Sequence, residues 1–277
     1  MTAEARPEPA SHYNRVTDAW RYLLGEDLHY GYFERSDMPL EVATKSLTRL
    51  LAASAALKPE MRVLDVGCGT GSPALHLAQE HGCRVLGIST SHVGIERAAA
   101  RADMANISHQ VRFEVRDGME TGLADESFDC IWVMESSHLM PRKDLLLKEC
   151  LRVLRPRGRM VLCDIMLLRE IPFDELLAIR KDVLVLDQVF GKAVMRKLPE
   201  YARLAKDAGF CVISQLDISR ETLPTLDRWR ANSELHASVV SELLGPVGLS
   251  RFRAACDILS RFWLDRLGYG LLVAERD

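Results

Sequence analysis

The sequence has no run of about eighteen apolar residues, the length that a membrane-spanning helix requires. It also lacks an excess of charge: the net charge is −3, and acidic and basic residues are interleaved along the chain. There is therefore no electrostatic reason to expect nucleic acid or an anionic membrane as a partner. The first residues contain no apolar stretch of the kind that a signal peptide carries, so we predict a cytoplasmic protein without stable membrane association.

Cysteine spacings typical of disulfide frameworks or metal sites are absent as well. The seven cysteines are odd in number, and no two of them are spaced as CxxC. Most lie in apolar segments, where a thiol behaves as a small hydrophobic side chain. We predict reduced thiols and no metal site. The composition leaves homo-oligomerisation open.

Apolar residues make up 48% of the 277-residue chain and charged residues 27%, which is ordinary for a protein with a packed core. Residues 1–11 are rich in Pro, Glu and Ala and are predicted to form a disordered tail. Residues 12–58 have mostly helical patterns and form a predicted N-terminal cap. Residues 59–277 form the predicted core, in which helical insertions occupy about 169–196 and 221–266.

From residue 61 onward, short apolar strands alternate with amphipathic helices. This order predicts an α/β fold with a doubly wound, seven-stranded, mostly parallel sheet and helices on both faces. The two insertions follow strands five and six, so we expect them to form a lid over the C-terminal edge of the sheet. The predicted strands are 61–67, 84–89, 111–117, 128–135, 158–167, 211–219 and 269–277, and the predicted core helices are 72–82, 91–105, 143–156 and 198–210.

Three glycines at alternate positions follow the first predicted strand, and an acidic residue lies two positions before them. These residues are Asp65, Gly67, Gly69 and Gly71. Glycine permits positive φ angles and lets a ligand approach the backbone closely. A carboxylate at this place would repel the phosphates of a dinucleotide, but it suits the ammonium and sulfonium groups of S-adenosylmethionine. The pattern therefore favours S-adenosylmethionine over a nicotinamide cofactor.

The ends of the second and third strands supply further candidate cofactor ligands. Ser89 and Thr90 stand where a carboxylate usually binds ribose, so ribose binding would rest on hydroxyl and backbone groups. The next residue, Ser91, is expected to cap a helix. After the third strand, an acid beside a glycine can accept a hydrogen bond from the adenine amino group, and a methionine can contact the ring. These residues are Asp117, Gly118 and Met119.

Strands four and five end in candidates for catalysis. Glu135, the last residue of strand four, is a candidate cofactor ligand. His138 follows it, and histidine titrates in a range that suits a general base, although a lone histidine is more often structural. Asp164, near the end of strand five, can orient this histidine, replace it, or simply cap a helix.

An aromatic segment at 29–33 interrupts the helical cap. Tyr30 can cover the methionine end of the cofactor and turn an aromatic face toward its sulfonium. Alternatively, the rings of this segment anchor the cap on the core. The sequence leaves both interpretations open.

Together these motifs resemble those of class I S-adenosylmethionine-dependent methyltransferases. The chain is similar to bacterial natural-product O-methyltransferases that act on sugars and macrolides, and next to their sterol, tocopherol and cyclopropane-synthase relatives. The similarity covers about residues 12–220. The segments that carry it are 12–14, 29–34, LDVGCGTG at 64–71, GIST at 87–90, RDGM at 116–119, ESSHLMP at 135–141 and LRVLRPRGRMVLCD at 151–164.

The resemblance implies an enzyme that transfers a methyl group from S-adenosylmethionine to a small, largely apolar secondary metabolite, with O-methylation favoured. It also implies a catalytic His/Asp pair, found in some O-methylating members, which maps onto His138 and Asp164. Three positions depart from the family pattern, and one of them, Arg157 in place of a common turn glycine, should affect only a surface turn. A glutamine common after the second strand is Gly94 here, which puts one cofactor contact in doubt, and Ser137 replaces a glutamate of the cyclopropane synthases.

Other activities stay open on the same motifs. C- or N-methylation of a terpenoid or alkaloid would use the same cofactor site. A non-methylating cyclase or sensor could retain the same fold. A nicotinamide oxidoreductase is disfavoured by Asp65 and by the missing ribose carboxylate after the second strand.

Overall fold

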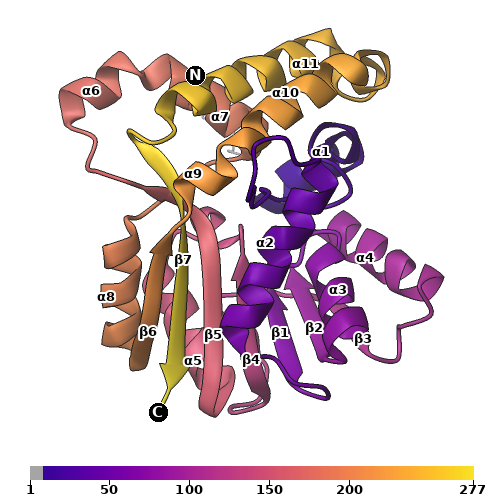
Figure 1. Ribbon diagram of the computed structural model, residues 1–277, viewed down its shortest axis with the longest axis vertical. Helices are drawn as coiled ribbons and strands as arrows, with labels where there is room; N and C mark the ends of the chain where they lie inside the picture. The colour runs from indigo at the N-terminus through magenta and orange to yellow at the C-terminus, as the bar shows by residue number, and fades with distance from the viewer. Residues whose placement is uncertain (1–8) are drawn as a thin grey trace, which may run out of the picture.

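Within residues 9–277, which the computed structural model describes, seven strands form one sheet (Figure 1). The strands are β1 (Arg62–Val66), β2 (Arg84–Ser89), β3 (Val111–Val115), β4 (Phe128–Met134), β5 (Leu154–Leu167), β6 (Phe210–Asp217) and β7 (Leu267–Arg276). Their order is β3-β2-β1-β4-β5-β7-β6. The first five strands of this order pair in parallel, whereas β7 is antiparallel to both of its neighbours, so the predicted mostly parallel sheet is confirmed.

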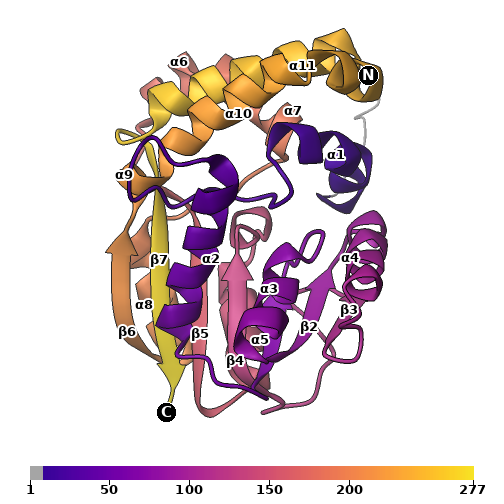
Figure 2. The same ribbon diagram turned by 45° about the vertical axis from the view of Figure 1, so that its right-hand side comes forward.

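Helices cover both faces of this sheet (Figures 1 and 2). One face carries α2 (Leu40–Ala55), α3 (Ser72–His81) and α4 (His92–Met104), and the other carries α5 (Lys143–Val153) and α8 (Leu198–Ala208). Parallel strands covered in this way are buried on both faces, and four of the five residues of β1 are buried. The apolar core is accordingly divided into two main clusters, one on each face of the sheet.

The remaining helices form a roof across the carboxyl ends of the parallel strands (Figures 1 and 2). The N-terminal segment contributes one of them, and the two predicted insertions contribute the others. Both insertions therefore lie over the C-terminal edge of the sheet. The helices of this roof are α1 (Pro9–Leu23), α6 (Phe173–Ala178), α7 (Arg180–Phe190), α9 (Ser219–Thr222), α10 (Pro224–Leu235) and α11 (Ala237–Phe262).

Several element boundaries differ from the predicted ones. α1 begins at Pro9, so the last three residues of the predicted tail 1–11 are helical, and residues 1–8 lie outside the described part of the chain. β5 begins four residues before the predicted 158, because Pro156 cannot continue the preceding helix. The insertion at 169–196 contains two helices, separated at Ile179.

The described residues contain no helix long and apolar enough to cross a membrane. They also contain no group of three or more His, Cys, Asp or Glu side chains arranged to hold a metal ion. All seven cysteines of the sequence fall within this part of the chain, and each is a free thiol. Six of them are buried, and the exposed one, Cys211, lies on the edge strand β6.

We predict that the roof segments 12–34 and 169–196 move together as a lid. They meet where Nε2 of His12 lies 3.0 Å from the carbonyl oxygen of Val189. Hydrogen exchange measured by mass spectrometry should show slower exchange in both segments after S-adenosylhomocysteine and an acceptor are added, because a closed lid protects its amides. The helix α5 serves as the internal control and should not change. Unchanged exchange in both roof segments would contradict the lid.

Candidate active site

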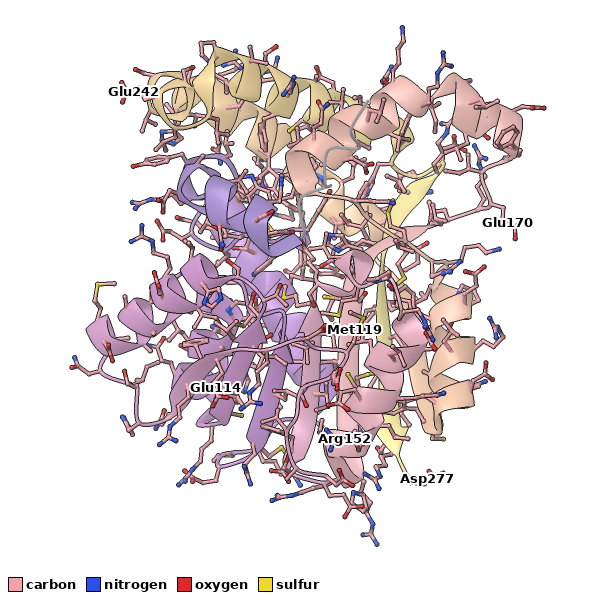
Figure 3. The ribbon with its side chains drawn as sticks, turned by 180° about the vertical axis from the view of Figure 1, so that it is seen from behind. Glu114, Met119, Arg152, Glu170, Glu242 and Asp277 are labelled. Carbon is pink, nitrogen blue, oxygen red and sulfur yellow. The ribbon has the colours of Figure 1, made fainter. Side chains whose placement is uncertain are left out.

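A cavity of about 550 Å³ lies between the carboxyl ends of the strands and the helical roof. Of the twelve residues predicted for the site, Asp65 and Asp164 are buried and do not line this cavity. Figure 3 shows one lining residue, Met119, nearer to the roof than Arg152. The predicted residues that line the cavity are Tyr30, Gly67, Gly69, Ser89, Thr90, Asp117, Gly118, Met119, Glu135 and His138.

Two glycines of the loop after β1 are needed for different structural reasons. Gly67 has a φ of +85°, and a Cβ at this position would lie 2.1 Å from the Cβ of Ser136, so glycine lets the loops after β1 and β4 approach each other. The Ser136 hydroxyl donates to the carbonyl of Val66 at 2.6 Å. Gly69 has a φ of +53° and faces the cavity, where an added Cβ would meet none of the surrounding described atoms within 4 Å. A ligand can therefore approach the backbone closely at Gly69.

Asp65 is the penultimate residue of β1 and is buried next to this loop. Its Oδ2 has no hydrogen-bond partner among the described residues. Burial raises the pKa of Asp65 to about 7, because no neighbouring cation compensates for the lost hydration. A ligand cation placed nearby would stabilise the ionised carboxylate.

At the end of β2, one serine caps the next helix and two other residues line the cavity. The Ser91 hydroxyl accepts a hydrogen bond from the amide of Gly94 at 3.0 Å, which confirms the expected helix cap. The same hydroxyl donates to Oδ1 of Asn14 on α1 at 2.7 Å and so ties the roof to the sheet edge. Ser89 and Thr90 both line the cavity, and the Ser89 hydroxyl accepts from the amide of Ser91 at 3.1 Å.

The turn after β3 packs closely against β1. A Cβ on Gly118 would lie 2.5 Å from Cγ1 of Val66, so a larger residue would push this turn outward. The exposed Asp117 accepts a hydrogen bond from the amide of Met119 at 2.8 Å through Oδ1. The turn therefore presents a carboxylate and a thioether side by side at the cavity.

Glu135 connects the N-terminal segment to the end of β4. Its Oε1 accepts hydrogen bonds from the amide of Tyr30 at 2.8 Å and from the hydroxyl of Tyr269 at 2.6 Å. Burial nevertheless raises the pKa of Glu135 to about 8, because these two bonds compensate only partly for the lost hydration. Glu135 is thus a carboxyl group at the cavity whose ionised form a bound cation would favour.

The Tyr30 ring is packed between other rings of the core. It stacks on Trp263 with 5.0 Å between ring centroids and meets Trp229 edge-on at 4.6 Å. Only 1% of the residue is exposed. This packing favours the interpretation that the ring anchors the cap on the core, although Tyr30 also lines the cavity and its amide is bonded to Glu135.

His138 and Asp164, predicted from two different strands, are in direct contact. Nδ1 of His138 lies 2.7 Å from Oδ1 of Asp164. Because a carboxylate oxygen can only accept, Nδ1 carries the proton and Nε2 holds the lone pair of the neutral ring. Burial alone would favour the neutral form of Asp164, but the charge of His138 and several hydrogen bonds lower the pKa of this carboxyl.

The roof side of the cavity is mostly apolar, although Asp187 from α7 also lines it. Tyr13 and Thr17 also line the cavity from α1, and neither was among the predicted site residues. Their spacing with Trp20 and Leu24 along one helical face was the available signal. Apolar residues that line the cavity from the roof are Trp20, Leu24, Ile179, Val183, Leu186, Phe190, Trp229, Leu259 and Phe262.

Comparisons with known proteins agree on one family. A family model described as a methyltransferase domain matches residues 57–189. The chain is 35% identical over 282 residues to the 27-O-demethylrifamycin SV methyltransferase of Amycolatopsis mediterranei, with 100% of this chain and 99% of that protein covered. It is 31% identical over 272 residues to methyltransferase GfsG of Streptomyces halstedii, with 97% and 94% covered.

Solved structures of similar shape include two proteins of different activity. The (4+2)-cyclase SpnF has a TM-score of 0.84 and 27% identity, with 99% of each chain covered. The mycolic acid cyclopropane synthase CmaA1, solved in complex with S-adenosylhomocysteine, has a TM-score of 0.87 and 20% identity, with 99% of this chain and 100% of that chain covered. The second similarity concerns the fold alone.

The chain therefore belongs to the class I S-adenosylmethionine-dependent methyltransferases, as its motifs predicted. It is an enzyme, and S-adenosylmethionine is its cofactor. The cavity suits this cofactor, because Gly69 leaves its backbone open, and the buried carboxyl of Asp65 beneath the same loop has an unpartnered oxygen that a nearby cation would stabilise as an anion.

We predict that Gly69→Val removes most of the affinity for S-adenosylmethionine while the protein stays folded, because the new side chain enters the open space at the cavity. Isothermal calorimetry should show a loss of at least about tenfold, and no competing affinity for NAD. Gly122→Val is the matched control, since Gly122 has a φ of +66° but lies outside the cavity. Gly67→Val should instead destabilise the fold, through its clash with Ser136. Unchanged cofactor affinity in Gly69→Val would refute this placement.

Proposed function

We propose that the enzyme methylates a hydroxyl group of a neutral, largely apolar small molecule of secondary metabolism, with His138 as the general base. The observation that carries the proposal is the position of His138. Its ring lines the cavity while Nδ1 is bonded to Asp164, so Nε2 is the nitrogen available to a bound hydroxyl. Asp164 is 0% exposed and does not line the cavity, so its role is to orient the ring.

The cofactor is proposed to lie along the loops at the strand ends. When bound, S-adenosylmethionine supplies an activated methyl group that is attacked in line by a nucleophile. The chain contributes alignment, exclusion of water under the roof, and removal of the hydroxyl proton at Nε2 of His138. The residues proposed to hold the cofactor are Tyr30 through its backbone, Asp65, Gly67, Gly69, Ser89, Thr90, Asp117, Gly118, Met119 and Glu135.

The charges around the cavity argue against an anionic acceptor, because the acidic residues Asp117, Glu135 and Asp187 line it. Among the described side chains that line it, the only lysine or arginine is Arg116, which pairs with Glu114 at 2.6 Å at the end of β3. A phosphate or carboxylate under the mostly apolar roof would have no such partner, and burying an unpaired charge is costly. The similarity to the 27-O-demethylrifamycin SV methyltransferase supports transfer to oxygen.

A cyclase is the second candidate, because SpnF is similar over the full length of the chain. The His138–Asp164 pair at the cavity favours methyl transfer instead. Methyl transfer to any acceptor, detected as S-adenosylhomocysteine release, would separate the two. A cytoplasmic location, an oligomeric state and the absence of a nucleic-acid partner remain predictions from the sequence.

Cofactor affinity should depend on pH through Asp65. In the free protein this carboxyl titrates near pH 7, and a bound cation should favour its ionised form, so binding releases a proton. Calorimetry should therefore show affinity for S-adenosylmethionine rising roughly fivefold to tenfold between about pH 6 and 7.5. Asp65→Asn should weaken this dependence and leave the part that comes from Glu135. A flat profile in the unaltered enzyme would exclude Asp65 as the cation's partner.

Turnover should depend on His138. His138→Ala should lower kcat about 10²-fold or more and leave cofactor affinity nearly unchanged, because a hydroxyl acceptor then lacks a base. Asp164→Asn should have a smaller effect. The unaltered enzyme should show an acidic limb in its rate profile, because a protonated ring cannot act as a base, and His138→Ala should lose it.

This experiment uses 27-O-demethylrifamycin SV as the first acceptor, together with other neutral hydroxyl compounds. His109→Ala, which removes an exposed histidine away from the cavity, is the control and should retain full activity. Near-normal turnover in His138→Ala would show that His138 is structural and that catalysis is alignment alone.

A further inference from the structure

The Asp164 carboxylate accepts four hydrogen bonds from described residues, although its side chain is completely buried. Oδ1 accepts from Nδ1 of His138 at 2.7 Å and from the amide of Ile165 at 2.8 Å. Oδ2 accepts from the Ser137 hydroxyl at 2.5 Å and from the amide of His138 at 2.9 Å. Each oxygen therefore has two donors, which is close to the full capacity of a carboxylate.

The direction of these bonds extends one residue further. A hydroxyl has a single hydrogen, and Ser137 must use it toward Oδ2 of Asp164, because that oxygen can only accept. The contact of 2.8 Å between Ser137 Oγ and the hydroxyl of Tyr201 then has only one possible direction: Tyr201 donates and Ser137 accepts. Donation therefore runs in one direction from Tyr201 through Ser137 to Asp164, and Asp164 also accepts from Nδ1 of His138.

This series of hydrogen bonds begins outside the cavity. Tyr201 lies on α8, on the face of the sheet that also carries α5, and it belongs to the core cluster of that face. Neither Tyr201 nor Ser137 lines the cavity, and both are 0% exposed. A substrate or cofactor in the cavity therefore cannot contact Ser137 or Tyr201. We expect any effect of these residues on the reaction to act through Asp164.

We propose that Ser137, oriented by Tyr201, is a positioning residue that limits how strongly Asp164 holds the proton of His138. The inference rests on the proposed base role of His138. A carboxylate that shares its charge among four donors attracts each of them less than a carboxylate with three. Ser137 thus keeps the imidazolium from being over-stabilised, so that the ring returns to its neutral form after each turnover.

Other titratable groups surround this network and must be distinguished from it. Lys143 donates to the carbonyl oxygens of Ser137 and Met140, and burial lowers its pKa to about 8. Glu135 titrates near the same pH. The groups whose charges act on Asp164 or are acted on by it are Tyr13 from α1, Tyr30 before α2, Glu135 after β4, Lys143 from α5, Cys163 from β5 and Tyr201 from α8.

The experiment reads the His138 ring directly, so that it needs no acceptor. The full chain is labelled with ¹⁵N-histidine and saturated with S-adenosylhomocysteine, and the ring nitrogens are followed by NMR between about pH 5 and 9. The His138 signal is assigned by its loss in His138→Ala. In Ser137→Ala, the titration midpoint of His138 should move to higher pH by about half to one unit. Tyr201→Phe should move it in the same direction by less.

Ser233→Ala is the matched control. Ser233 is also a serine with 0% exposure, and its hydroxyl bonds to the carbonyl of Arg230, far from Asp164 in the chain and outside the cavity lining. Its removal should leave the His138 midpoint unchanged. A purely structural role of Ser137 would lower the melting temperature without moving the midpoint, and this result would overturn the proposal.

Turnover of 27-O-demethylrifamycin SV provides a second, separable readout. In Ser137→Ala, kcat measured at the pH values of the acidic limb should fall about threefold to tenfold. The plateau value of kcat at higher pH should change less than about twofold. A moved NMR midpoint with no acidic limb in any variant would reject the base role of His138 but keep the positioning effect. An unmoved midpoint with a limb that depends on His138 would reject the positioning role alone.

Discussion

The close approach of the loops after β1 and β4 is the constraint on which the site depends. These strands are neighbours in the sheet although four elements separate them in the chain, so both loops emerge at the same edge. The approach is possible because Gly67 has no side chain where Ser136 lies, and the Ser136 hydroxyl bonds to the β1 backbone. A larger residue at either point would separate the cofactor loop from the turn that carries His138.

Three buried or partly buried carboxyl groups surround this junction, and their hydrogen bonds distinguish them. Asp65 has an unpartnered oxygen, and burial raises its pKa to about 7. Glu135 has two donors on one oxygen, and its pKa is raised to about 8. Asp164 has donors on both oxygens, and its pKa is lowered. Only Asp164 is therefore held as an anion before any ligand arrives, which suits a group that orients a histidine.

Most of the fold and much of the site could be predicted from local patterns. Buried runs such as 62–66 and the cap at Ser91 need only neighbouring residues to specify them, and both were found as expected. The early start of β5 was missed although Pro156 marks the end of the preceding helix, and the break at Ile179 was missed because no glycine or proline marks it in the sequence. Tyr30 was predicted at the cavity, but the sequence could not show that its ring stacks on Trp263.

By itself, the sequence determined the order of strands and helices, the glycine loop and the residues at each strand end, because periodicity, glycine placement and capping act within a few residues of the chain. The tertiary structure alone decided which of these strand ends meet. It brought His138 onto Asp164, 26 residues away, and Ser137 onto Tyr201, 64 residues away. No local pattern encodes such contacts. They arise only when β4 and β5 pair, which brings their carboxyl ends together, and when α8 packs on the face of the sheet that also carries α5.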